Sequence, residues 1–235
     1  MKKLLKKSLL ASLLSLTATS VMAASSVDIK VTGKIVPSAC EPSFPGGGGI
    51  ADFGTTKVAS LSSTTPTTLP GVKEVPVAIT CEEATRVGVT FTDVHSASAP
   101  TQAYNINFAD TDLSSGAKYL FGLGTYNNQK IGAYALGISL DAGKITNDNG
   151  DNLKVYFTGD GGVAWGTKAG TRYMQIINDK SEIYAFGSVA KGEPEPQTKV
   201  NFIVGVSAII NPTNDLQITD EATLDGLTTV ELVYL

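Results

Sequence analysis

The sequence is poor in the residues that most often build catalytic and metal sites. It has a single histidine, His95, and two cysteines, Cys40 and Cys81. This supply is too small for a structural zinc site, which draws its ligands mainly from these two residue types. The glycine run at 46–49 lacks the Lys-Ser/Thr pair that completes a phosphate-binding loop. We therefore predict a protein that is not an enzyme and that has no cofactor or metal, with His95 an ordinary loop histidine.

Long apolar runs are missing as well, and the one apolar stretch of note lies at the N-terminus. Lysines within residues 2–7 precede a short apolar stretch at 9–16, and small residues follow at Val21 and Ala23. This layout is typical of a cleavable secretory signal. The stretch is too short to cross a bilayer, which takes about 20 apolar residues. We predict a signal peptide over residues 1–23, cleaved after Ala23 or Ala24, and no membrane span once it is removed.

Basic residues are in the minority. Of the 18 lysines and arginines, four lysines precede the predicted cleavage site, so the remaining 14 face 22 acidic residues and leave a net charge of about −8. An acidic surface disfavours nucleic acid as a partner, because phosphate neutralisation by basic side chains drives such binding.

The two cysteines lie 41 residues apart and both follow the predicted signal. In an oxidising compartment such a pair is most simply a disulfide, with two buried free thiols as the alternative. A bridge over this span would restrict the unfolded chain by roughly 4 kcal/mol.

Helical periodicity is absent from the long stretches after the signal, and alternating or β-branched runs take its place. Residues 86–93 follow the strand at 74–81 after a four-residue link that favours a hairpin, and residues 34–39 continue extended into Cys40. We expect turns at 147–152 and 159–162, and short strands with regular turns favour a sandwich or barrel. The predicted strands cover residues 27–31, 74–81, 86–93, 130–141, 153–158, 172–178, 181–187, 199–210 and 227–235.

Two candidate ligand sites have simpler explanations. The acidic group at 148–151 offers oxygen atoms for calcium but lacks the spaced ligands of a calcium loop, so a turn is the better interpretation. Trp165 and Tyr173 are candidates for stacking on a sugar, although aromatic side chains in β proteins more often fill the core.

Four segments carry a family resemblance. They are residues 31–40 (VTGKIVPSAC), 52–54 (DFG), 77–81 (VAITC) and the C-terminal 230–235 (VELVYL). In these segments the chain resembles the pilin subunits of chaperone–usher fimbriae, and as a whole it looks closest to a longer branch of fimbrial-like proteins. The resemblance is good over residues 27–93 and at the C-terminus and loose between them.

The resemblance implies an all-β, immunoglobulin-like sandwich that lacks its final strand and has an enlarged middle region at 93–199. A periplasmic pilus chaperone fills the gap first, and the N-terminal extension of a neighbouring subunit replaces it at an outer-membrane usher. Val27, Ile29 and Val31 would be the donor side chains, since alternate residues of a strand share one face. A typical member has a longer extension, with a glycine before Gly33, so the donor register stays open.

At the other end of the chain, the resemblance implies that Val230, Leu232 and Tyr234 line the groove and that the Leu235 carboxylate contacts the chaperone. The two cysteines would tie the first two strands of the domain.

We accordingly expect a signal peptide at 1–23, a donor extension at 24–33 and one sandwich domain at 34–235, exported through the periplasm to a surface fimbria and contributing to adhesion. The alternative is a secreted sandwich that recognises carbohydrate or a host surface, with Trp165 and Tyr126 as its first candidates.

Overall fold

The computed structural model describes residues 28–35, 39–46, 48–108, 111–168 and 172–235. The chain divides into two units, residues 1–36 and 37–235. The predicted signal peptide and Val27 lie outside the described residues.

In the first unit, residues 28–35 belong to neither a helix nor a strand, and every one of them is exposed. Residues 28–31 therefore form no strand within the single chain, and a donor strand at 27–31 that pairs with a neighbouring subunit stays a prediction. The expected extended run into Cys40 gives a strand only from Cys40 onward. An alternating sequence supplies the two faces of a strand, but a strand also needs a neighbour for its backbone hydrogen bonds.

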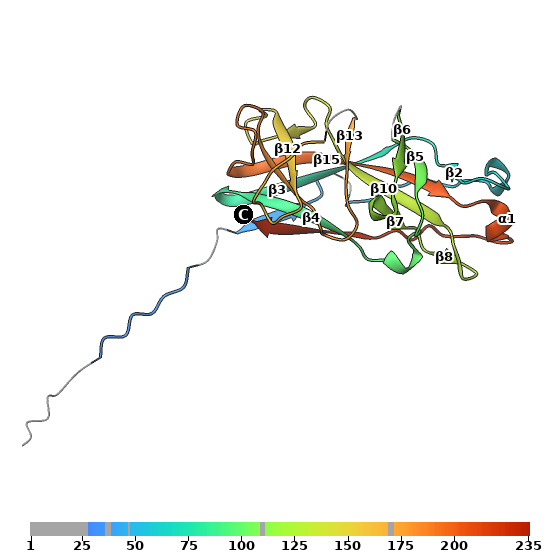
Figure 1. Cartoon of the computed structure of the whole chain (residues 1–235), viewed down its shortest axis with the longest axis horizontal. Coiled ribbons are helices and arrows are strands. Elements are labelled where there is room, and N and C mark those ends of the chain that lie inside the picture. The colour runs from blue at the N-terminus through green and yellow to red at the C-terminus, as the bar shows by residue number, and fades with distance from the viewer. Residues whose placement is uncertain (1–27, 36–38, 47, 109–110, 169–171) are drawn as a thin grey trace, which may run out of the picture. The chain divides into compact units, whose positions relative to one another are not determined.

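The second unit contains two main antiparallel sheets (Figure 1). The larger sheet has the order β1-β3-β15-β10-β13, with β2 and β11 pairing with β15 and β7 pairing with β10. Its strands are β1 (Cys40–Ser43), β2 (Thr67–Thr68), β3 (Lys73–Thr85), β7 (Leu120–Gly122), β10 (Gly132–Ser139), β11 (Ile145–Thr146), β13 (Tyr173–Gln175) and β15 (Gln197–Ile210).

The smaller sheet has the order β12-β14-β4-β16. Its strands are β4 (Val87–Asp93), β12 (Leu153–Thr158), β14 (Ile183–Ser188) and β16 (Thr228–Tyr234). Two short ribbons and four single helical turns complete the described part: β5 (Tyr104–Phe108) with β6 (Thr111–Ser115), β8 (Thr125–Tyr126) with β9 (Gln129–Lys130), the 3-10 turns η1 (Val58–Ser60), η2 (Ser96–Ser98) and η3 (Ala117–Tyr119), and α1 (Thr213–Leu216).

The all-β prediction is confirmed, and the strand order is that of an immunoglobulin-like sandwich. In such a fold strands A, B, E and D form one sheet, and C, F and G form the other. Here β1, β3, β15 and β10 take the first order, while β4 and β16 take the places of C and F. No strand in the described residues takes the place of G beside β16, which is an edge strand of its sheet.

The predicted hairpin between residues 74–81 and 86–93 is wrong. Strand β3 continues to Thr85 and belongs to the larger sheet, while β4 begins at Val87 in the smaller one. A tight hairpin turn needs residues with positive φ, and none of residues 82–87 has one. The link therefore crosses between the sheets instead of folding β4 back on β3.

The main core lies between the two sheets, and a second, smaller cluster lies on the other face of β10. Along β10, Tyr134 and Leu136 belong to the main core, while Ala133 and Ala135 join Ile106 and Phe108 of β5 in the second cluster. Strand β10 is thus buried on both faces, which explains why its sequence reads as a continuous apolar run without alternation.

Candidate functional site

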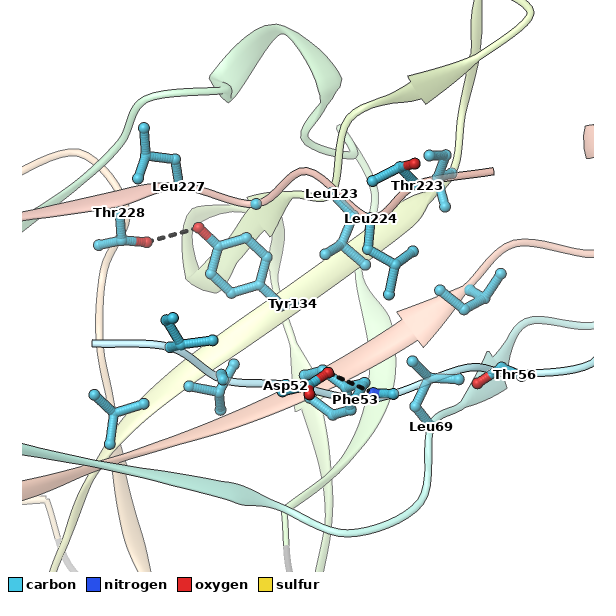
Figure 2. A pocket seen from close by; sticks show the side chains of 18 of the residues that line it. Asp52, Phe53, Thr56, Leu69, Leu123, Tyr134, Thr223, Leu224, Leu227 and Thr228 are labelled. Carbon is cyan, nitrogen blue, oxygen red and sulfur yellow. Dashed lines mark hydrogen bonds between the residues drawn. The ribbon is translucent and has the colours of Figure 1, made fainter. Parts of the chain in front are cut away.

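A groove of about 950 Å³ opens between the two sheets along one side of the sandwich (Figure 2). One wall is formed by residues within 44–58 and the other by residues within 218–230. The floor consists of main-core side chains from the larger sheet: Val75, Val77, Tyr134, Leu136, Val204 and Val206. The groove is therefore an opening into the core of the domain.

An unpaired strand edge lies along each side of the groove. Strand β1 pairs with β3 only from Cys40↔Cys81 to Ser43↔Ala78. Beyond Ser43 the wall continues through residues 50–57, which form no strand, so β3 has no described partner on that side from Val77 to Lys73. On the opposite wall β16 pairs with β4 along one edge, and its other edge has no partner among the described strands.

Tyr134 stands on the floor between the walls. Figure 2 shows its ring lying between Asp52 and Phe53 on one side and Leu227 and Thr228 on the other. Its hydroxyl forms a 2.7 Å hydrogen bond with the Thr228 hydroxyl, and burial raises the pKa of Tyr134 far above its usual range. The ring thereby attaches β10 to the start of β16.

Two side chains that do not line the groove, Tyr126 and His95, hold the wall at 218–227 in place. Tyr126 donates its hydroxyl hydrogen to Asp220 and accepts one from the Thr219 amide at 3.2 Å. Further along, Nδ1 of His95 lies 2.6 Å from the Asp225 carbonyl oxygen. Because a carbonyl oxygen can only accept, His95 carries its hydrogen on Nδ1. His95 is thus a loop residue that supports the groove wall.

Next to His95, the carboxylate of Asp93 is buried and accepts two backbone hydrogen bonds. Its oxygens lie 2.9 Å from the His95 amide nitrogen and 2.8 Å from that of Gly122. Burial raises the pKa of Asp93, and the two amide donors act in the opposite direction. Because the folded pKa lies above the unfolded value, protonation of Asp93 stabilises the folded state at low pH. This stabilisation is lost as the pH rises through the folded pKa.

Replacing Asp93 with alanine is expected to lower the free energy of unfolding by about 2 kcal/mol, because two amide groups behind the groove wall lose their acceptor. Urea unfolding at neutral pH measures the loss. The matched control is Asp179→Ala, which removes an exposed carboxylate that accepts one bond from the Ser181 amide at 3.0 Å, and should cost about 0.5 kcal/mol or less. Equal losses for the two variants would contradict a supporting role for Asp93.

The groove closes at its disulfide end. Cys40 and Cys81 form a disulfide, as predicted. The Cys40 amide donates a 3.0 Å hydrogen bond to the Tyr234 hydroxyl, which joins β1 to the last residue of β16. The Leu235 amide bonds to the Arg86 carbonyl oxygen at 3.1 Å.

Two of the predicted groove residues of β16 pack against the core, and the other two are exposed. Val230 and Leu232 are half-buried and pack against the main core, and Val230 lines the groove. Tyr234 and Leu235 are exposed. In the other unit, the predicted donor side chains Ile29 and Val31 are 91% and 92% exposed.

Sequence reasoning missed most of both walls. Of the wall at 44–58, only the DFG motif was recognised. Its Phe53 ring lies under the Lys73 ammonium, 5.5 Å from ring centroid to nitrogen, and Asp52 accepts a 2.7 Å bond from the Gly54 amide. The wall at 218–227 has no strand pattern. Contacts with Tyr126 and His95, from distant parts of the chain, hold it in position, so no local pattern indicates it.

The structure does not gather the predicted sugar-stacking residues into one site. Tyr173 is buried against Phe108, and its hydroxyl bonds to Glu74. The Tyr126 hydroxyl forms hydrogen bonds with Asp220 and Thr219 of the groove wall. Trp165 lies in the loop after β12, whereas Tyr126 belongs to β8.

The acidic group at 148–151 forms a turn. The Asn147 side-chain oxygen accepts bonds from the Asn149 and Asp151 amides at 3.0 and 2.8 Å, and Gly150 takes a φ of 83°. Within the described residues, no group of three or more histidine, cysteine or acidic side chains is placed to hold a metal ion.

Comparison with known proteins relates this structure to a family. Residues 29–135 match the family described as "Protein of unknown function (DUF1120)". A relative from Escherichia coli (strain K12), "Uncharacterized protein YhcF", is 32% identical over 229 residues, which span 89% of this chain and 90% of the relative. The chain belongs to the DUF1120 family.

The match to the DUF1120 family includes both cysteines, strands β3 and β4 and the groove wall at 44–58, and it ends inside β10. It also takes in residues 29–35 of the first unit. In the part of the DUF1120 chain that the structure describes, no helix has the length and apolar character to cross a membrane.

Proposed function

We propose that this protein is a structural subunit of a chaperone–usher surface fimbria, and that a β-strand donated by another chain completes its sandwich. One observation carries the proposal: an apolar groove opens into the core between two unpaired strand edges, where an immunoglobulin-like sandwich would hold strand G. The disulfide between the first two strands of the domain and the similarity of residues 31–40 and 230–235 to pilins support it.

An unoccupied groove of this kind is unfavourable in water. Unpaired strand edges are templates for aggregation, and the backbone groups of β16 gain partners when an extended segment is added along its edge. Each apolar side chain inserted over the floor would contribute about 1.5–3 kcal/mol by leaving water. Three such anchors would supply roughly 5–9 kcal/mol before any backbone hydrogen bond is counted.

The proposal assigns roles to both ends of the chain. Val27, Ile29 and Val31 are the donor side chains of the next subunit in a polymer that contributes to adhesion. A periplasmic chaperone fills the groove before assembly and contacts the Leu235 carboxylate, and an outer-membrane usher exchanges one strand for the other. Export follows from the signal at 1–23, and the subunit itself performs no catalysis.

A self-complemented chain tests the proposal. Residues 27–34 are fused after Leu235 through a linker of about four residues, so that the added strand folds back along the free edge of β16 as in a hairpin. We expect the mature chain alone to aggregate, and the fused chain to be a monomer with a cooperative unfolding transition. The matched control carries Ile29→Asp and Val31→Asp in the fused segment and should aggregate like the parent.

Two results would count against the fimbrial proposal. One is a mature chain that folds as a stable monomer without help. The other is a control fusion that is rescued as well as the apolar one, which would mean that the groove does not recognise apolar anchors. Co-purification of the mature chain with a periplasmic chaperone would support the assigned partner directly.

A further inference from the structure

The turn at 147–152, between β11 and β12, contains a residue pair that occurs once in the chain. Only at Asn149 is an asparagine followed directly by a glycine. Both residues are exposed, and Gly150 takes a φ of 83°, a conformation that suits a residue without a side chain. Within the described residues, the Asn149 side chain forms no hydrogen bond. Its carboxamide therefore lies in water, next to a backbone amide that no side chain shields.

The hydrogen bonds of the turn leave this pair less restrained than its neighbours. The Asn147 side-chain oxygen accepts from the Asn149 and Asp151 amides at 3.0 and 2.8 Å. The Asn147 Nδ2 also donates to the Asp151 carboxylate at 3.1 Å. The Gly150 amide donates to the Asn147 carbonyl oxygen at 3.3 Å, just beyond the usual range for such bonds. The nitrogen nearest in sequence to the Asn149 carboxamide thus has the longest hydrogen bond of the turn.

We propose that Asn149 is a site of spontaneous modification, at which the side-chain amide is replaced and the turn is opened. The Gly150 amide nitrogen loses its proton to base and attacks Cγ of Asn149. A bond forms between these two atoms, the bond from Cγ to Nδ2 breaks, and Nδ2 takes up a proton and leaves as ammonia. Water then opens the five-membered imide at either carbonyl, which gives aspartate or isoaspartate.

This reaction needs nothing that the protein lacks. Water is the only reactant consumed, ammonia is the only group released, and no atom is oxidised or reduced. The nucleophile and the electrophile belong to adjacent residues, and reactions within one molecule proceed as if the partner were present at very high concentration. The modification is independent of strand complementation, because the turn is not part of the groove.

Other asparagines lack one of these conditions. Asn128 is exposed and has a φ of 63° in the turn between β8 and β9, but a glutamine follows it, and a side chain at that position hinders access to the nitrogen. Asn178 donates its Nδ2 to the carbonyl oxygens of Ala117 and Leu120 at 3.2 and 2.6 Å, which holds its carboxamide in place. Asn128 therefore provides a matched comparison for Asn149.

Two aspartates, Asp160 and Asp225, also precede a glycine. Carboxyl groups of aspartate are ordinarily ionised at neutral pH, and an ionised carboxylate resists attack by nitrogen. The Thr158 hydroxyl and neighbouring backbone amides lower the pKa of Asp160 further by hydrogen bonding to its carboxylate. We expect neither aspartate to react as fast as Asn149.

The products change the turn in two ways. Both add a negative charge close to Asp148 and Asp151, where like charges repel. Isoaspartate also inserts a methylene group into the backbone, so the Asn149 and Asp151 amides lose their common fit to the Asn147 side-chain oxygen. The Asp148 carboxylate accepts a 3.0 Å hydrogen bond from the Thr198 hydroxyl, so opening of the turn also weakens its link to β15.

Mass spectrometry of the mature chain, purified as it is recovered after export, tests the inference. The chain is incubated in buffers of increasing pH and digested, and the peptides with Asn149 and Asn128 are compared for the gain of about 1 Da that replacement of the amide produces. We expect conversion at Asn149 to be at least about tenfold faster, since displacement of reacting atoms by about 1 Å changes rates on the order of 100-fold. The rate should rise with pH, and isoaspartate methyltransferase should label the product.

Two variants separate the residue pair from the looseness of the turn. Gly150→Ala should slow conversion at Asn149, although alanine is strained at this φ and loosens the turn. Gln129→Gly creates the same pair at Asn128 and should make that residue convert. Limited proteolysis of fresh and aged chain should show new cleavage within 147–152 after ageing, and none in an aged Asn149→Gln chain.

Each outcome decides one part of the inference. Conversion at Asn149 no faster than at Asn128, or undiminished in Gly150→Ala, would overturn the modification site. Conversion without new cleavage within 147–152 would overturn the opening of the turn. Neither result changes the case for strand complementation, which the self-complemented chain tests separately.

Discussion

Removal of the Cys40–Cys81 disulfide is expected to lower the free energy of unfolding by about 4 kcal/mol. The bond closes a loop across a sequence separation of 41 residues, and its loss releases that loop in the unfolded chain. It also joins the directly opposed residues of β1 and β3, at the end where Tyr234 attaches β16 to Cys40. Without it we expect β1 to separate from β3 more readily, so the closed end of the groove loosens.

Urea unfolding of the self-complemented chain measures this loss, since that form should be monomeric. The variant is Cys40→Ser with Cys81→Ser, compared with the parent in the presence and absence of dithiothreitol. The reductant should destabilise the parent by a similar amount and leave the double variant unchanged. A loss below about 1 kcal/mol in the variant would contradict the unfolded-chain explanation.

The longer strands of the two main sheets were predictable because they combine apolar or β-branched residues with nearby turn signals, whereas the short strands β1, β2, β7 and β11 were not predicted. Strand β12 has the predicted bounds of 153–158, and β15 and β16 each lie within two residues of theirs at both ends. The disulfide followed from two cysteines in a chain with a predicted export signal. Both kinds of prediction use patterns that are local in the sequence.

Other features depend on contacts that local patterns do not report. The segment at 82–85 suggests a hairpin link because it is short, yet it has no residue with positive φ. It belongs to β3, and the chain passes to the other sheet between Thr85 and Val87. Strand β5 covers the second buried face of β10 with Ile106 and Phe108, a contact that no local pattern in residues 96–116 indicates. Of the groove, the strand β16 was predictable, whereas both of its irregular walls were not.

A partly buried ion pair beside β14 is the other feature on which stability should depend strongly. Nζ of Lys168 lies 2.6 Å from Glu182 Oε2, and the two side chains are 25% and 12% exposed. The ammonium also lies 4.6 Å from the centroid of the Phe157 ring and 5.4 Å from that of Tyr119. Glu182 accepts a 2.6 Å hydrogen bond from the Tyr184 hydroxyl as well, and burial together with this carboxylate raises the pKa of Tyr184 far above its usual range.

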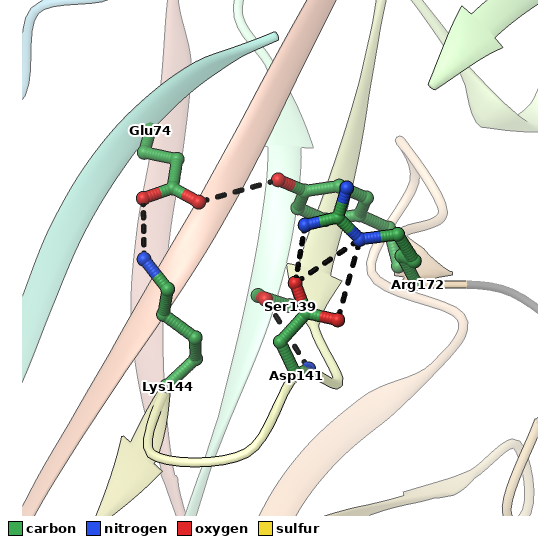
Figure 3. A network of polar contacts seen from close by, with 6 residues as sticks. Glu74, Ser139, Asp141, Lys144 and Arg172 are labelled. Carbon is green, nitrogen blue, oxygen red and sulfur yellow. Dashed lines mark hydrogen bonds and ion pairs between the residues drawn. The ribbon is translucent and has the colours of Figure 1, made fainter. Parts of the chain in front are cut away.

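An exposed pair in the same molecule provides the comparison. Glu74 and Lys144 form an ion pair of nearly the same length, 2.7 Å, and Glu74 likewise accepts a hydrogen bond from a tyrosine hydroxyl, that of Tyr173 at 3.4 Å (Figure 3). Both of its charged side chains are 38% exposed. When one partner of an exposed pair is removed, water hydrates the charge that remains. Exposed pairs therefore typically contribute about 1 kcal/mol or less.

We therefore expect Glu182→Ala to lower the free energy of unfolding by about 3 kcal/mol, and Glu74→Ala by about 1 kcal/mol or less. The first variant removes the carboxylate partner of Lys168 and the closer acceptor of the Tyr184 hydroxyl, and it leaves both groups with the Gln175 carbonyl oxygen, at 3.2 and 3.4 Å. The second variant leaves the Lys144 ammonium within reach of solvent. Urea unfolding of both variants in the self-complemented chain measures the difference. The double variant Glu182→Ala with Lys168→Met should recover part of the first loss, because the uncompensated charge is then gone. Equal losses for Glu182→Ala and Glu74→Ala, or a double variant less stable than Glu182→Ala alone, would show that burial of the charge does not determine the cost.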